Sequence, residues 1–167
     1  MPDRKTLERA ARDKRRGKAP STQAGEFVRE EMEHIREGKH GARSTRQAIA
    51  IGLSKARRAG VDLPPPAKGR ASQKTRRSAK RALKAAHDAG RKPRSAKRAQ
   101  AVEAALRREP RTAASKAALA RQAKSAARKR TKAQRSAAAR KAARTKGPQE
   151  RSAAARKAAR TRKLRRR

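Results

Sequence analysis

Arginine and lysine are the side chains with functional chemistry that this sequence repeats most often. The eleven-residue phrase R-S-A-A-A-R-K-A-A-R-T occupies Arg135–Thr145 and returns unchanged at Arg151–Thr161. Guanidinium and ammonium groups bind phosphate oxygens through their charge, and the arginine fork adds two parallel hydrogen bonds. The repeat therefore predicts a surface that binds phosphates, such as those of a nucleic-acid backbone.

The positive charge is distributed unevenly along the chain. The sequence has 53 Lys and Arg against 13 Asp and Glu among its 167 residues, which gives a formal net charge of +40. Residues 64–167 hold thirty-seven of the basic residues and four of the acidic ones. This excess indicates a basic interaction tail on a head of more ordinary composition. The predicted nucleic-acid-binding residues are Lys39, Arg43, Arg46, Arg76, Arg77, Lys80, Arg81, Arg128, Lys129, Arg130, Arg135, Arg140, Lys141, Arg144, Arg151, Arg156, Lys157 and Arg160.

We expect DNA as the partner, bound without sequence preference. The sequence has no Asn and few Gln, the amide side chains that read adenine, and no aromatic residue after Phe27 for stacking on single strands. RNA or the ribosome is the alternative, because phosphate contacts do not separate the two nucleic acids. Membrane binding is disfavoured, because the side opposite the basic residues is alanine rather than Trp, Phe or Leu. The apolar run Ala48–Leu53 is also far shorter than the ~20 residues that span a bilayer.

Two places in the head carry other candidate chemistry. Glu31-x-x-His34 has the spacing of carboxylate-bridged metal sites, but the sequence contains no second motif of this kind, so we expect no metal or cofactor. The alternative is a solvated acidic face that pairs with neighbouring arginines or with the tail. The turn Lys39–Arg46 precedes a helix whose first amides and Ser44 hydroxyl suit a phosphate. Ser44 as a simple helix cap explains this turn equally well.

An enzyme is not expected. The sequence shows no nucleophile and base pair, no paired catalytic carboxylates and no glycine-rich phosphate loop, and so small a core cannot enclose a pocket. There is no cysteine, which excludes disulfides and thiolate-bound zinc.

The head is predicted to be a helical hairpin. Asp3 can cap a short first helix that runs to about Arg16. A second helix begins after Ser21 or Thr22 and presents apolar residues 27, 28, 32 and 35 on one face before Gly38 ends it. Ser44 and Gln47 form a capping box that opens a third helix, in which residues 49, 53 and 56 share a side and Gly60 ends the element. Gly52 on that side allows close backbone approach.

Two features of the head suggest its limits. Large apolar side chains are scarce, so we expect no core larger than this hairpin. Ile51 points away from the packed side, which suggests self-association or packing against the N-terminal helix; a single exposed isoleucine is an equally good interpretation. A head that acts as an interaction or oligomerisation module, with the tail as a solvating anchor, is therefore a further alternative function.

The tail is predicted to be partly helical and partly disordered. Alanine and arginine favour helix over 71–91, 94–108 and 112–144, whereas like charges four residues apart oppose it until a polyanion binds. Prolines 93, 110 and 148, with glycines 90 and 147, divide the tail into short rods. The fold class is thus mostly α. The expected regions are a basic N-terminal helix and linker at 1–20, the hairpin at 21–63, a proline spacer at 64–70 and the repetitive tail at 71–167.

The segment G-E-F-V-R-E-E-M-E-H-I-R-E-G-K-H-G-A-R-S-T-R-Q-A-I-A-I-G-L-S-K-A-R-R-A-G, Gly25–Gly60, resembles a family of small basic bacterial proteins known only as a domain of unknown function. The resemblance covers about Lys5–Pro66 and implies a bacterial origin, but no activity. The tail resembles the C-terminal domains of linker histones and bacterial histone H1-like proteins, although it uses Arg as much as Lys. The resemblance of the tail implies DNA condensation. Together with the charge and the absence of catalytic motifs, it leads us to expect a non-enzymatic, nucleoid-associated DNA-compacting protein in the cytoplasm.

Overall fold

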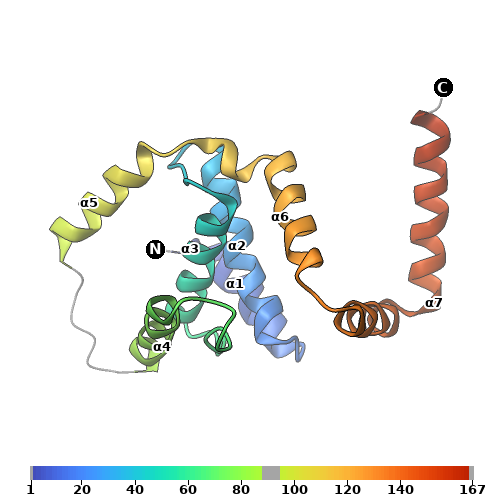
Figure 1. The fold of residues 1–167 in the computed structure, drawn as a ribbon, viewed down its shortest axis with the longest axis horizontal. Helices are drawn as coiled ribbons and strands as arrows, with labels where there is room; N and C mark the ends of the chain where they lie inside the picture. The colour runs from blue at the N-terminus through green and yellow to red at the C-terminus, as the bar shows by residue number, and fades with distance from the viewer. Residues whose placement is uncertain (1, 88–94, 166–167) are drawn as a thin grey trace. The chain divides into compact units, whose positions relative to one another are not determined.

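The computed structural model describes residues 2–87 and 95–165, and every regular element in these ranges is a helix. The elements are α1 (Arg4–Arg15), α2 (Pro20–Arg36), α3 (Thr45–Arg58), α4 (Gln73–His87), α5 (Ala96–Arg107), the 3₁₀ helix η1 (Arg111–Ala114), α6 (Lys116–Arg128) and α7 (Lys132–Arg165) (Figure 1). The predicted mostly α fold is confirmed. The chain divides into two compact units, Met1–Gln122 and Ala123–Arg167. Among the described residues, none of the helices has the length and apolarity needed to cross a bilayer.

Helices α2 and α3 form the predicted antiparallel pair (Figure 1). Helix α2 begins one turn earlier than expected because Pro20 occupies its first turn, where the missing N–H costs nothing. Both helices end before glycines with positive φ, Gly38 at 80° and Gly60 at 86°, as predicted. At the start of α3, Oγ of Ser44 accepts a hydrogen bond from the amide of Gln47 at 3.2 Å. The predicted cap is confirmed.

The two helices approach closely at Gly52. A Cβ atom at this position would lie 2.7 Å from Cα of Val28 on α2. The expectation that Gly52 allows a close backbone approach is confirmed. Ile51, on the other side of α3, is partly buried rather than fully exposed.

The head core consists of two apolar clusters. One contains Met32, Ile35, Ala42, Ala48, Ala113 and Ala114. The other contains Ala10, Ala24, Phe27, Ala56 and Val61. The faces predicted on α2 and α3 supply four of these eleven side chains, Phe27, Met32, Ile35 and Ala56, whereas Ala10 comes from α1 and two alanines come from η1. The expectation that the core would be no larger than the hairpin was therefore wrong.

Helix α1 packs against α2 through small residues. Thr6 and Ala10 of α1 are buried, and Nε of Arg9 lies 2.6 Å from Oε2 of Glu26. Asp3 stands at the N-cap position, as predicted, but its side chain makes no capping hydrogen bond. Its carboxylate instead lies 3.1 Å from Nε2 of His34 on α2. Asp3 therefore links the start of α1 to the middle of the head.

The segment 106–114 packs on the head as well, although the sequence assigns it to the repetitive tail. The amides of Gly41 and Ala42 donate to the carbonyls of Leu106 and Pro110 at 2.8 and 3.0 Å. The hydroxyl of Thr45 donates to the carbonyl of Ala113 at 2.7 Å. These bonds are made largely by backbone atoms, so an Ala-rich segment can dock without large side chains.

Candidate nucleic-acid interface

The two copies of the eleven-residue repeat lie in two separate helical segments of α7. Gly147 has φ 67° and ψ 169°, which interrupts the helix between the copies, and Pro148 follows it. The predicted break at this point is confirmed. Equivalent hydrogen bonds recur in both copies: the hydroxyl of Thr145 donates to the carbonyl of Lys141 at 2.9 Å, and that of Thr161 to Lys157 at 3.0 Å. Each copy is therefore a helical unit of the same local geometry.

Within one copy three of the four basic residues share a side of the helix, and Arg135 lies on the opposite side. At 100° per residue, Arg140, Lys141 and Arg144 fall within a sector of about 100°. Alanines 138, 139, 142 and 143 take the other side. The copy thus presents a ridge of positive charge, backed by methyl groups.

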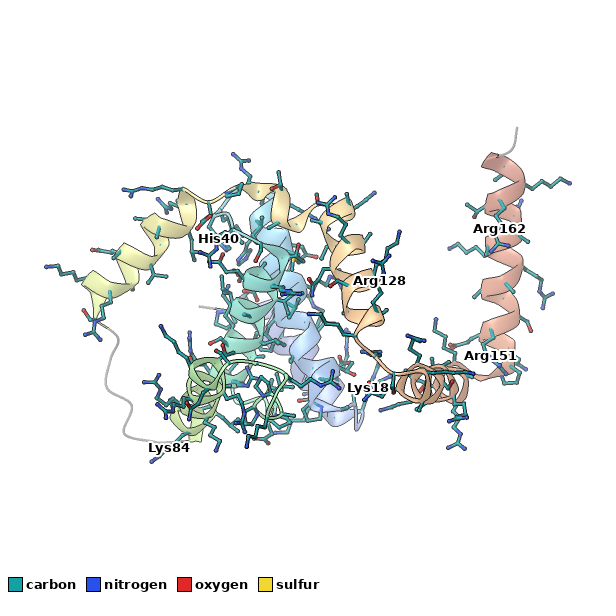
Figure 2. All side chains as sticks on the ribbon, in the orientation of Figure 1. Lys18, His40, Lys84, Arg128, Arg151 and Arg162 are labelled. Atoms are coloured by element: carbon teal, nitrogen blue, oxygen red, sulfur yellow. The ribbon has the colours of Figure 1, made fainter. Side chains whose placement is uncertain are left out.

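Seventeen of the eighteen predicted binding residues have exposed side chains. The exception is Arg76, which is half-buried because its Nε donates to the carbonyl of Pro66 at 3.1 Å. Figure 2 labels Arg128 on α6 and Arg151 on α7, and Nε of Arg151 donates to the carbonyl of Gly147 at 3.1 Å. Seven of the residues belong to the first unit, in the turn after α2, at the start of α3 and on α4, and eleven to the second.

Several hydrogen-bonding groups of the turn Lys39–Arg46 already have partners within the protein. Ser44 caps α3, and the amides of Gly41 and Ala42 already donate to the segment 106–110. His40 places Nε2 3.1 Å from Oε1 of Glu31. The cap interpretation therefore accounts for this turn, and the groups that it still offers to a phosphate are the exposed side chains of Lys39, Arg43 and Arg46. Lys39 also lies 3.0 Å from Glu37, and this hydrogen bond raises the pKa of Lys39.

The acidic residues of α2 are not uniformly solvated. Glu30 and Glu31 are fully buried, and Nζ of Lys55 on α3 lies 3.4 and 2.7 Å from them. The amide of Asp3 donates to Glu30 at 3.1 Å. The interpretation of α2 as a solvated acidic face is therefore wrong for these two residues, although Glu33, which pairs with Arg29, fits it.

A group of possible metal ligands lies beside this buried pair. Ligand atoms of Glu31, His34 and His40 all lie within 4.8 Å of one another. His34 also contacts Asp3, and the hydrogen bond from His34 lowers the pKa of Asp3. The Glu31-x-x-His34 spacing was the visible sequence signal for this group. Nothing in the sequence placed His40 or Lys55 beside it, because both contacts depend on how α2, α3 and the turn pack.

A comparison with known families found a match in the head. Residues 3–68 match the model described as Family of unknown function (DUF6496). The resemblance inferred from Gly25–Gly60 is thereby confirmed, and the match extends through α1. No curated protein and no solved structure matches the chain.

Proposed function

We propose that this protein binds duplex DNA without reading its sequence, and compacts it in the bacterial nucleoid, by neutralising backbone phosphates with its basic tail. The observation that carries the proposal is the second unit, residues 123–167, which holds nineteen Lys and Arg against one acidic residue. All of its basic side chains in 123–164 are exposed. So dense an uncompensated charge attracts the most abundant polyanions of a cell.

The charge of this unit matches a short length of DNA. Duplex DNA carries about one charge per 1.7 Å of axis, so a net charge of +18 corresponds to about 30 Å, or about nine base pairs. If each of the nineteen basic side chains of this unit contacts one phosphate, log K falls with log salt with a slope no steeper than about −17. Binding should therefore be tight at low salt and weak at high salt.

The two helical copies of the basic ridge are better suited to contact the phosphate backbone of DNA than to recognise its bases. Arginine and lysine side chains meet phosphates by charge and fork geometry, and such contacts carry no sequence information. The interruption at Gly147 lets each copy meet the backbone independently. A protein that holds two stretches of backbone at once can bridge or bend a duplex, which is the basis of compaction.

The proposal is tested with two full-length variants that lose the same charge. The tail variant replaces six residues of the repeat ridges by Gln: Arg140, Lys141, Arg144, Arg156, Lys157 and Arg160. The control replaces six exposed basic residues of the head region by Gln: Lys5, Arg12, Lys14, Arg15, Arg16 and Lys18. Affinity for duplex DNA and for duplex RNA of equal length is measured across a salt series.

The tail variant should lose about five units of salt slope, since each phosphate contact contributes about 0.9. The control should keep nearly the wild-type slope. Equal losses in the two variants would show that total charge, rather than the repeats, binds the duplex. A clear preference for RNA would instead assign the protein to an RNA or ribosome partner.

A further inference from the structure

The buried group of titratable side chains in the head has no role in the proposed DNA binding. It contains Glu31 and His34 of α2 and His40 of the following turn, and their ligand atoms lie within 4.8 Å of one another. Glu31 is fully buried, and the side chains of His34 and His40 are 11% and 13% exposed. Burying a carboxylate is costly unless a cation or hydrogen-bond donors compensate its charge.

The contacts of His40 show where such a cation fits. Its Nδ1 lies 3.0 Å from the carbonyl oxygen of Gly41, and its Nε2 lies 3.1 Å from Oε1 of Glu31. Both neighbours are acceptors, whereas a neutral imidazole has one N–H to donate. If Nδ1–H bonds the carbonyl, the bare Nε2 faces a carboxylate oxygen. In that tautomer the space between Nε2 and Oε1 is a position for a metal ion or a second proton, whereas the other tautomer donates Nε2–H to Glu31 and leaves Nδ1 without a proton against the carbonyl.

The charges around Glu31 favour a metal ion. The carboxylates of Glu30, Glu31 and Asp3 lie on this side of the head, and the ammonium group of Lys55 contacts the first two. Both carboxylate oxygens of Glu31 are buried and lack a partner with hydrogen-bond geometry. One ammonium offsets one of these negative charges, so a divalent cation would balance the group.

We propose that Glu31, His34 and His40 bind a divalent transition metal, with Zn²⁺ as the best fit. Zinc bonds of about 2.0–2.2 Å in a tetrahedron place neighbouring ligand atoms about 3.3 Å apart, close to the 3.1 Å between Nε2 of His40 and Oε1 of Glu31. Imidazole and carboxylate together suit Zn²⁺, Ni²⁺ and Cu²⁺ rather than Mg²⁺ or Ca²⁺, which prefer oxygen ligands alone.

The surroundings of the two histidines match those of metal ligands. Ligating histidines usually donate their second ring N–H to a backbone carbonyl or a carboxylate, which fixes the ring. The carbonyl of Gly41 stands in that position for His40, and the carboxylate of Asp3 lies 3.1 Å from Nε2 of His34. Asp3, Glu30 and His34 form a second group of closely spaced ligand atoms that shares His34 with the first.

A metal at this position has a structural role. It would join α2 to the turn that contains His40, and through Asp3 to the start of α1. The same turn holds the segment 106–110 by two amide hydrogen bonds. Binding to the folded state alone stabilises a protein by mass action, so metal should raise the unfolding temperature of the head.

The test uses the full-length chain without an affinity tag, stripped of metal and titrated with Zn²⁺ alone by calorimetry. We expect one site per chain, no competition from Mg²⁺, and a tetrahedral cobalt spectrum when Co²⁺ replaces Zn²⁺. His40→Gln and Glu31→Gln should each weaken binding at least tenfold. Asp3→Asn should weaken it by about tenfold through His34.

His87→Ala is the matched control, because it removes the third histidine of the sequence from a different helix. Circular dichroism without metal shows which variants keep the fold, and Asp3, with a side chain 55% exposed, tolerates substitution most easily. The proposal is overturned if the wild type binds no Zn²⁺, or if His87→Ala weakens binding as much as His40→Gln. The contact between His40 and Glu31 is then an imidazolium–carboxylate pair.

Discussion

Nζ of Lys55 on α3 lies 2.7 Å from Oε2 of Glu31 on α2, where the Glu31 side chain has no exposed surface and that of Lys55 is 21% exposed. This contact joins the two helices of the head by a charge pair taken largely out of water. A buried pair of this kind contributes little net stability against an apolar replacement, but breaking it leaves one charge buried without a partner.

Lys55→Met should therefore destabilise the head by about 3 kcal/mol, because it keeps the apolar stem and removes the charge that faces Glu31. The measurement is chemical unfolding followed by circular dichroism in metal-free buffer. Adding Glu31→Gln to Lys55→Met should recover most of the loss. Arg4→Met, which breaks the exposed pair with Glu8, should change stability by less than about 1 kcal/mol. Equal effects of Lys55→Met and Arg4→Met would contradict the prediction.

Two glycines in helices of the head should respond to alanine in opposite directions. Gly52→Ala places a methyl group 2.7 Å from Cα of Val28, so the helices must separate, at a cost of about 1–3 kcal/mol. Gly25→Ala, on α2, meets nothing within 4 Å and should stabilise the head by about 1 kcal/mol through helix propensity. Thermal unfolding of the two variants checks both signs, and a stabilising Gly52→Ala would show that the helices do not approach closely there.

Gly41→Ala should release the segment 106–114 from the head. A methyl group on Gly41 would overlap the carbonyl of Glu109, and the backbone there has no flexible side chain that can move aside. The hydrogen bonds of Gly41 and Ala42 to this segment should then be lost. Trypsin should cut faster at Arg107, Arg108 and Arg111 in the variant than in the wild type.

Cleavage at Arg128 in the same digest is the internal control for Gly41→Ala, because it lies in the second unit and should proceed at the wild-type rate. An unchanged rate at Arg107 and Arg111 would show that the segment does not depend on this contact.

The helical pair of the head could be predicted from sequence because its signals are local. The apolar spacing of α2 and α3, the cap at Ser44 and the glycines after each helix all act within a few residues. The break at Gly147 was visible for the same reason.

The other contacts of the head could not be predicted from the sequence. Some are made by small residues and backbone groups, and others join residues that are distant in the sequence. Ala113 and Ala114 enter the core from a segment whose composition resembles the rest of the tail, so no hydrophobic pattern distinguishes them. His40 and Lys55 reach Glu31 across the packed helices, and no sequence spacing encodes that distance. Contacts of this kind can be found only once the three-dimensional structure is known.

The break at Gly147 leads to a prediction about DNA binding that can be tested by a substitution that leaves the charge of the chain unchanged. The two copies of the repeat start sixteen residues apart, at Arg135 and Arg151. In one continuous helix this offset turns the second basic ridge by about 160° from the first, so the two ridges would face nearly opposite directions. The backbone of Gly147, with φ 67° and ψ 169°, lies in a region that only glycine adopts readily.

Replacing both Gly147 and Pro148 by Ala should therefore make α7 continuous and leave one copy unable to reach a duplex held by the other. Helical content should rise, while the salt slope of DNA binding falls by about 3, the share of the three basic residues on one ridge. Circular dichroism and a salt series on the full-length chain measure the two effects. Gln149→Ala, which leaves the break in place, is the control and should change neither. A continuous helix that binds with the wild-type slope would show that the ridges need not face the same way, and that charge density alone accounts for binding.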